Sequence, residues 1–255
     1  MKIGVLGFGE VGQAVSKLYD SPSIKDLDRD DGLDNSKILN VCIPFSEKFV
    51  EIVSNEISAI KPDLTIIHST VMPGTTESIS KIINSPIVHS PIRGVHPNLY
   101  EGILTFVKYV GSDDKKSSDL AKKHLESLGL SVKLLSSSRN SEIGKLLDTT
   151  YYGVAIAWHG EMKKLCDQIG ADFDEAVTDF NETYNSGYDK LGKKNVIRPV
   201  LFPPDGPIGG HCVIPNAKLL VLVPFGVFFP TTIKAKFFMI FWLISQFLIA
   251  IQSNN

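Results

Sequence analysis

The chain has 255 residues, of which 43% are hydrophobic and 21% are charged, and its formal net charge is −2 at pH 7. This composition is that of a globular protein of one large or two ordinary domains, and the lack of a basic excess argues against a nucleic-acid partner. The three cysteines form no CxxC pair, which favours a reducing compartment and argues against a zinc site or a disulfide framework. Because Met1 and Lys2 lead directly into an apolar run, we expect no signal peptide and a cytoplasmic location.

The chain opens with the pattern of a dinucleotide-binding unit. The apolar run Ile3–Leu6 predicts a strand, and it is followed by Gly7-Phe8-Gly9-Glu10-Val11-Gly12 and a helical pattern. In a Rossmann unit, Gly7 allows the tight turn, Gly9 lets the backbone approach the pyrophosphate, and Gly12 allows close helix packing. A GxGxxG pattern alone is weak evidence. Its position between a strand and a helix at the start of the chain predicts a cofactor site formed by these six residues.

The ribose of the cofactor should be bound by an acidic residue about 20 residues further on. Asp26 is the first candidate and Asp28 the second, although a solvated acidic turn would have the same composition. An acid here favours NAD over NADP, because it would repel a 2′-phosphate. We also assign Pro44, at the end of the predicted strand Ile38–Pro44, and Thr70 to the cofactor site.

An α/β alternation continues after this strand, with Cys42 in the core. We expect a helix from Phe45 to Ile60 and a strand Leu64–His68, which leads into the loop that contains Thr70. Loops at the carboxyl ends of parallel strands bind ligands, so Thr70 is a candidate to bond a substrate or a water molecule. The alternative is a hydroxyl that caps the next helix.

The rest of the first domain contains one more polar loop. A helix through Ile82 and the strand Ile87–His89 precede the loop Ser90–Asn98. In this loop Arg93 could hold an anion and His96 could move a proton, although solvated loop residues are the favoured interpretation of both. A strand at 106–111, a helix at 121–128 and a strand at 132–135 complete the domain.

A long helical pattern without proline runs from Asn140 to Ile169. Lys145 and Thr149 are four residues apart and share one face of this helix, and Cys166 belongs to its core side. The length suggests a central or dimer-forming helix. Gly170 ends it, and a second helix should start at Asp172 or Asp174 and run to about residue 181.

The loop-like run from Gly206 to Asn216 contains Gly209-Gly210-His211-Cys212. Glycines let the backbone pass close to a ligand, and a cationic His211 would favour the reactive thiolate of Cys212. A small buried cysteine in a turn is the plainer interpretation. The dinucleotide fingerprint at the start of the chain favours a reactive thiol that assists redox chemistry.

In this order the motifs resemble those of the nucleotide-sugar dehydrogenase family, typified by UDP-glucose 6-dehydrogenase and UDP-N-acetylmannosamine dehydrogenase. The matching pieces are the glycine motif, Ser69–Thr75, Ser90-Pro91, Glu142–Leu146 and Gly209–Cys212. The resemblance implies oxidation of a primary alcohol to a carboxylate with two NAD. It implies Cys212 as the nucleophile, Lys145 as the stabiliser of oxyanion charge, and Thr70 as the residue that positions substrate or water.

Three residues depart from the family pattern. Ile92 stands where the family carries a glutamate linked to thioester hydrolysis, Thr149 replaces an asparagine and Asn216 replaces an aspartate. The hypothesis that His96 replaces the missing base would be removed by a His96→Ala variant with unchanged turnover. The departures leave the thiol and the lysine in place but alter the acid–base groups.

The resemblance also implies a second Rossmann-like domain that binds much of the UDP, for which 255 residues leave too little chain. After Lys218 the sequence becomes very apolar. Our first interpretation of residues 219–255 is a tail foreign to the fold, the second is a hydrophobic docking helix, and the third is a membrane anchor. The most apolar block, 237–251, is shorter than the ~20 residues of a membrane span.

The sequence therefore predicts an α/β protein in which an NAD-binding Rossmann domain (1–138) precedes a helical central domain with one long helix (139–218) and the apolar tail. The expected function is NAD-dependent oxidation of a nucleotide sugar through Cys212, by a homodimer without a bound metal. One alternative is a 3-hydroxyacid dehydrogenase of the 6-phosphogluconate type, which shares the Rossmann domain and the helix lysine but needs no thiol. The other is a non-catalytic NAD-binding remnant.

Overall fold

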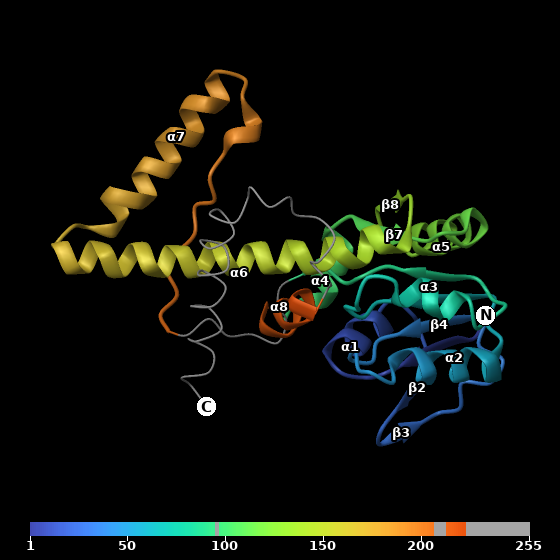
Figure 1. Cartoon of the computed structure of the whole chain (residues 1–255). Coiled ribbons are helices and arrows are strands. Elements are labelled where there is room, and N and C mark those ends of the chain that lie inside the picture. The colour runs from blue at the N-terminus through green and yellow to red at the C-terminus, as the bar shows by residue number, and fades with distance from the viewer. Residues whose placement is uncertain (95–96, 207–212, 223–255) are drawn as a thin grey trace, which may run out of the picture. The chain divides into compact units, whose positions relative to one another are not determined.

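The computed structural model describes residues 1–94, 97–206 and 213–222 (Figure 1). The chain forms two compact units, of which the first is Met1–Leu147 and the second begins at Asp148. Within the described ranges, no helix combines the length and the apolar character that crossing a membrane requires.

The first unit is built on a sheet with the strand order β3-β2-β1-β4-β5-β6-β7-β8. Its strands are β1 (Ile3–Leu6), β2 (Ser23–Asp26), β3 (Arg29–Asp30), β4 (Ile38–Val41), β5 (Leu64–Ile67), β6 (Ile87–His89), β7 (Lys108–Gly111) and β8 (Val132–Leu135). Neighbouring strands are parallel except for the pairs β2–β3 and β6–β7. After β1 the chain forms β2 and β3 toward one edge of the sheet, and it then returns to form β4 on the other side of β1. This is the strand arrangement of a Rossmann fold.

Successive side chains of a strand point to opposite faces of the sheet, and apolar strand residues occur on both faces. Helices therefore cover both faces. The helices of this unit are α1 (Glu10–Ser16), α2 (Phe49–Ile60), α3 (Thr75–Ser80), α4 (Leu99–Thr105) and α5 (Lys115–Ser127). One core cluster joins Val5, Ile66 and Val88 to residues of α1, α4 and α5. A second joins Leu39 and Ile67 to α2 and α3. This two-sided α/β sheet confirms the predicted Rossmann fold class.

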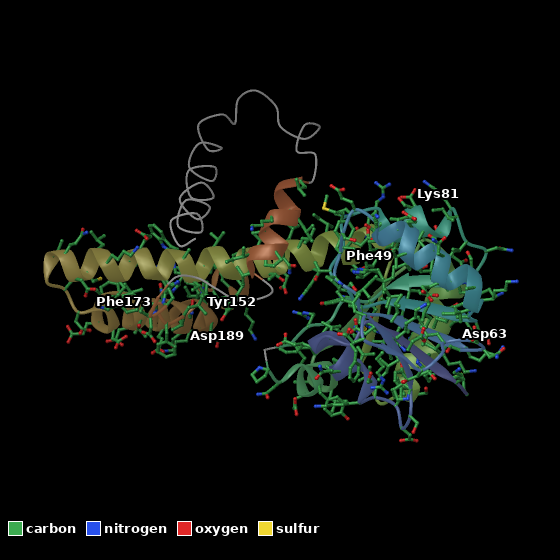
Figure 2. The ribbon with its side chains drawn as sticks, turned by 90° about the horizontal axis from the view of Figure 1, so that it is seen from below. Phe49, Asp63, Lys81, Tyr152, Phe173 and Asp189 are labelled. Atoms are coloured by element: carbon green, nitrogen blue, oxygen red, sulfur yellow. The ribbon has the colours of Figure 1, made fainter. Side chains whose placement is uncertain are left out.

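The second unit is helical. Helix α6 (Ser138–Ile169) begins in the first unit and carries the chain into the second, and Figure 2 shows side chains along it and along α7. Gly170 follows α6 with φ 72°, and η1 (Asp174–Thr178), α7 (Asp179–Lys190), η2 (Lys194–Val196) and α8 (Val213–Leu222) complete the described elements. The long helix starts two residues before its predicted position and ends where expected.

Several predicted boundaries were wrong. Helix α5 begins at Lys115 rather than near residue 121, and strand β7 begins at Lys108 rather than at residue 106. Helix α2 begins at Phe49 rather than at Phe45, because the N–H of Phe49 donates to Ser46 O at 3.0 Å and closes a turn ahead of the helix. The ring of Phe45 still packs on that of Phe49, with centroids 5.6 Å apart, which explains the apolar spacing in the sequence. The predicted end of α7 near residue 181 was too early.

Helix α7 continues to Lys190 through a stretch that is polar on average. The rings of Tyr184 and Tyr188, one turn apart, have centroids separated by 4.6 Å, and Arg198 lies 3.6 Å above the Tyr184 ring. Asn185 also donates to Arg198 O at 2.8 Å and accepts from Arg198 N at 2.7 Å. These contacts stabilise a polar helix that its hydrophobic pattern does not reveal.

The run predicted as a loop up to Asn216 is helical from Val213 onward. Pro215 fits there because, in the first turn of a helix, its missing N–H removes no intrahelical hydrogen bond. Strand β3 and helix α4 were not predicted either. The remaining residues of the apolar tail, 223–255, lie outside the described ranges.

Candidate active site

The carboxyl ends of β1 and β4 lie side by side at the point where the strand order reverses. Gly7 follows β1 with φ 95°, a conformation that favours glycine. A Cβ on Gly7 would lie 2.7 Å from Ile43 N, so the turn packs closely against the residue after β4. Ligands of open α/β sheets bind at this kind of switch point.

The other two glycines of the motif have different surroundings. A Cβ on Gly12 would lie 2.0 Å from Gly7 O, so the first turn of α1 can approach β1 only without a side chain there. A Cβ on Gly9 would meet no atom within 4 Å. Gly12 therefore serves the packing of the turn, whereas Gly9 leaves the backbone open on the side where a pyrophosphate would approach.

Asp26, at the end of β2, contacts this turn directly. Its carboxylate accepts hydrogen bonds from Phe8 N at 2.5 Å and from Leu27 N at 2.7 Å. Asp28 is exposed, so Asp26 is the acid next to the glycine motif. Arg29 lies 5.3 Å from the Phe8 ring centroid and is paired with Asp31.

The other residues assigned to the cofactor surround the turn less closely. Glu10 is exposed at the start of α1, and Val11 packs against the core. Pro44 is exposed just beyond β4.

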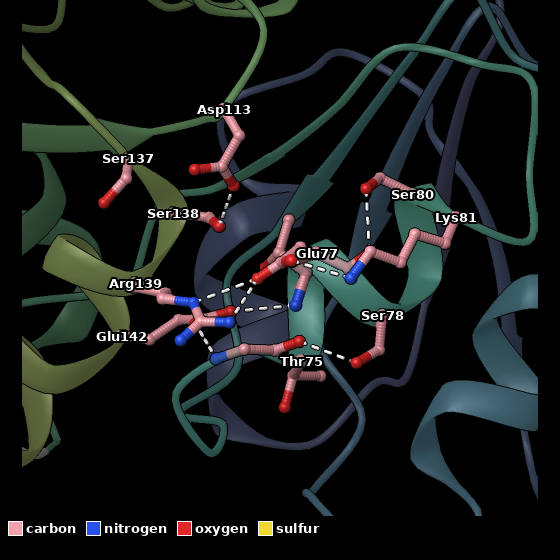
Figure 3. Close-up of polar contacts among 12 residues, drawn as sticks. Thr75, Glu77, Ser78, Ser80, Lys81, Asp113, Ser137, Ser138, Arg139 and Glu142 are labelled. Atoms are coloured by element: carbon pink, nitrogen blue, oxygen red, sulfur yellow. Dashed lines mark hydrogen bonds and ion pairs between the residues drawn. The ribbon is translucent and has the colours of Figure 1, made fainter.

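The hydroxyl of Thr70 does not cap α3, so the alternative role for it is excluded. The N-cap residue of α3 is Gly74, and Figure 3 shows the carboxylate of Glu142, from α6, at this helix end. Glu142 accepts from Gly74 N at 2.6 Å and from Thr76 N at 2.8 Å, and it is fully buried. Burial raises its pKa, although the two N–H groups partly offset this shift. Thr70 itself is half-buried in the loop after β5.

Lys145 is half-buried on α6, one turn beyond Glu142. Its charge contributes to the lowered pKa values of His89 and Lys108, after the larger effect of burial. Ser141, one turn earlier on α6, hydrogen-bonds His89 at the end of β6, so Lys145 lies near this end of the sheet. The first unit thus brings Lys145 toward the loop that contains Thr70.

Three buried polar side chains, Asn40, His68 and Lys108, form a cluster beneath these loops that the sequence did not predict. Lys108 is 3% exposed, and its ammonium donates to Ser90 O, to Pro91 O at 3.0 Å and to His68 Nδ1 at 3.2 Å. His68 Nε2 lies 2.9 Å from Asn40 Oδ1. Burial lowers the pKa of Lys108 to about 7. The available signal was a lysine two residues before Val110, on the apolar side of a predicted strand.

No protein-family model matches the chain. It is 29% identical over 171 residues to UDP-N-acetyl-D-mannosamine dehydrogenase of Methanocaldococcus jannaschii, with 63% of this chain and 37% of that protein covered. It is 23% identical over 233 residues to the protein of the same name from Pyrococcus horikoshii, with 83% and 52% covered. The chain is thus similar in sequence to proteins that carry the name UDP-N-acetyl-D-mannosamine dehydrogenase. It spans about a third to a half of the length of these relatives.

Solved structures agree with the Rossmann fold. The structure of UDP-D-ManNAc dehydrogenase from Pyrococcus horikoshii superposes with a TM-score of 0.69 at 20% identity, and 89% of this chain and 66% of that chain are covered. Mycobacterium tuberculosis 3-hydroxyisobutyrate dehydrogenase gives a TM-score of 0.64 at 15% identity, with 93% and 94% covered. At such identities these likenesses show the fold alone.

The three residues that depart from the nucleotide-sugar dehydrogenase pattern lie in different parts of the fold. Ile92 is 6% exposed and belongs to the apolar core. Thr149 is half-buried on α6, and Asn216 is 4% exposed on α8. Cys212, His211 and His96 lie outside the described residues.

Arg93 lies against aromatic rings, and the other two cysteines lie in the core. The Arg93 guanidinium lies 5.4 Å from the ring centroids of both Phe106 and Tyr109. Cys42 and Cys166 are buried, as the sequence predicted. Within the described ranges, no group of three His, Cys, Asp or Glu residues could hold a metal ion.

Proposed function

We propose that this chain binds NAD and oxidises the primary alcohol of a nucleotide sugar to a carboxylate. The observation that carries the proposal is the glycine turn at the switch point, with Asp26 bonded to it, in a chain whose relatives are named UDP-N-acetyl-D-mannosamine dehydrogenases. The open backbone at Gly9 fits a pyrophosphate. The sugar is a UDP-hexose, by similarity to these relatives.

The glycine turn and Asp26 would hold two NAD molecules in succession, each of which supplies the oxidant for one two-electron step. Thr70 would hydrogen-bond the substrate or a water molecule, and the Lys145 ammonium would stabilise the developing oxyanion. The Cys212 thiolate would add to the aldehyde and form a thiohemiacetal. Loss of the second hydride would leave a thioester, and water would then release the carboxylate and the free thiol.

The stoichiometry of NADH tests this mechanism. With a panel of UDP-sugars, we expect two NADH per substrate consumed for the wild type. The Cys212→Ser variant should stop after the aldehyde, because it lacks the thiol that carries the second oxidation. Cys166→Ser, at a cysteine buried elsewhere, is the matched control. One NADH per substrate, unchanged in Cys212→Ser, would contradict the proposal.

Asp26 is expected to select NAD over NADP. Each of its carboxylate oxygens accepts one backbone N–H and retains a lone pair for a ribose hydroxyl, and its charge would repel a 2′-phosphate. Asp26→Asn should bind NAD about tenfold more weakly and discriminate less against NADP, because a charge-assisted hydrogen bond is lost. Calorimetric titration with both dinucleotides measures this. Asp28→Asn, at the exposed neighbour, should behave as the wild type.

A 3-hydroxyacid dehydrogenase is the second candidate. Such enzymes also combine a Rossmann domain with a lysine at the start of a long helix, as Lys145 stands on α6. Such an enzyme would make one hydride transfer without a thiol, so the NADH count and its response to Cys212→Ser separate the two functions. NAD binding without any turnover would indicate the third alternative, a non-catalytic protein.

We further propose a homodimer formed along α6. Tyr151, Trp158, Leu165 and Ile169 are 65%, 53%, 57% and 71% exposed, and their spacing places them on one face of the helix. Trp158→Glu should convert the dimer into a monomer in light scattering, because it puts a charge into an apolar contact. Lys163→Glu, on the opposite side of α6, should leave the mass unchanged. An unchanged mass for Trp158→Glu would count against this interface.

A further inference from the structure

The loop Ser69–Gly74, which carries Thr70, is held at both ends by the beginning of α6. At its first residue, Ser69 O lies 3.0 Å from His89 Nε2, and His89 Nδ1 lies 2.8 Å from the Ser141 hydroxyl. At its last residue, Gly74 N donates to Glu142. Two consecutive residues of α6 therefore reach the two ends of one short loop.

The hydrogen bonds at His89 determine its protonation. A carbonyl oxygen can only accept, so Nε2 carries the proton that goes to Ser69 O. In the neutral ring Nδ1 is an acceptor for the Ser141 hydroxyl, whose one proton is shared with Ser138 O, also at 2.8 Å. His89 is fully buried, and burial lowers its pKa to about 3. The ring is a neutral bridge between a strand end and a helix, out of reach of a substrate.

Lys145 shares a helix face with both residues that hold the loop. It follows Ser141 by four positions and Glu142 by three, and side chains at these spacings lie one above the other. The helix approaches the sheet closely here, since a Cβ on Gly111 would lie 2.3 Å from the Ser141 hydroxyl oxygen. A rotation or shift of α6 would therefore move Lys145 relative to the Thr70 loop, unless the bonds to Ser69 and Gly74 prevented it.

We propose that His89, acting through Ser141 and together with Glu142, is a positioning residue that fixes Lys145 relative to Thr70. The inference rests on the proposed function for the roles of Lys145 and Thr70, but the bridge itself belongs to the fold. His89 would thus affect the reaction without contacting the substrate. Reacting groups lose rate steeply when they are displaced by about 1 Å.

The test compares His89→Phe, Ser141→Ala, their double variant and Glu142→Gln in the full chain. We expect kcat to fall about tenfold or more with an unchanged KM for NAD, because orientation is lost but the glycine turn is untouched. The double variant should be no slower than the slower single variant, since both changes break the same link. Amide exchange at Gly74 and Thr76 should accelerate in Glu142→Gln.

Ser138→Ala is the matched control. Ser138 is also buried in the first turn of α6, but its hydroxyl bonds Asp113 at 2.5 Å and not the loop. Competitive acetylation of Lys145, read by mass spectrometry, needs no turnover and should increase in His89→Phe and Ser141→Ala but not in Ser138→Ala. If the wild type shows no dehydrogenase activity, the proposed function fails and the acetylation result still decides the bridge. Acetylation and exchange identical to the control would overturn the inference.

Discussion

Between pH 7 and pH 9, the free energy of unfolding of the wild type is expected to rise by about 2 kcal/mol. Replacing Lys108 by methionine should abolish this rise. Burial lowers the pKa of Lys108 to about 7 in the folded protein. A lysine in the unfolded chain keeps its proton until about pH 10.4. Between these values the unfolded state binds a proton that the folded state lacks, so the free energy of unfolding increases with pH.

Other buried groups titrate largely outside this window. The lowered pKa values of His68 and His89 act below pH 7. Burial raises the pKa of Cys42 to about 12, so this thiol lowers the free energy of unfolding progressively above the ~8.5 of an unfolded cysteine and offsets part of the rise near pH 9. The raised pKa of Tyr19 acts in the same direction from about pH 10. Urea unfolding at a series of pH values measures the slope. Lys133→Met, at an exposed lysine on the neighbouring strand β8, should keep the rise. A slope equal to that of the wild type in Lys108→Met would contradict the assignment.

Gly12→Ala and Gly9→Ala should separate folding from cofactor binding. In Gly12→Ala the new methyl group would lie 2.0 Å from Gly7 O, which is backbone and cannot rotate away. We expect a loss of about 3 kcal/mol or more in the free energy of unfolding, at the upper end of overpacking effects. Denaturant unfolding of the protein without NAD measures it. A stability within error of the wild type would show that α1 can move away from β1.

In Gly9→Ala the new methyl group meets no atom within 4 Å, and Gly9 has a φ of −65° that alanine also adopts. Because alanine is a poorer N-cap than glycine, the free energy of unfolding should fall by about 0.5–1 kcal/mol, which is far less than for Gly12→Ala. NAD binding should weaken by about tenfold or more, because the methyl group occupies the side on which the pyrophosphate would lie. Unchanged NAD affinity in a folded Gly9→Ala protein would mean that the phosphates lie elsewhere.

Much of the α/β alternation could be predicted because apolar periodicity reports burial directly. Ile3–Leu6 and Ile87–His89 are strands with the predicted bounds, and the 32-residue α6 lacks any proline that would break it. The glycine motif was equally clear, since each glycine meets a local backbone requirement. Such signals lie within a few neighbouring residues of the sequence.

The missed features depend on contacts between distant residues. Glu142 caps a helix that begins 67 residues earlier in the chain, so no local pattern assigns it that role. Lys108 sits in the core because carbonyls of Ser90 and Pro91 surround it. A polar residue on an apolar strand face was the only local indication, and its partners became evident in the fold.

The cap on α3 affects how the protein can be divided for study. A fragment that stopped at Ser138 would remove the carboxylate that receives the N–H groups of Gly74 and Thr76, and would leave His89 without the Ser141 hydroxyl. Buried groups without partners are costly. A fragment extended to Leu147 would keep every one of these bonds, since it contains all of the first compact unit. The nine residues that separate these end points would therefore decide whether an isolated Rossmann unit folds during expression.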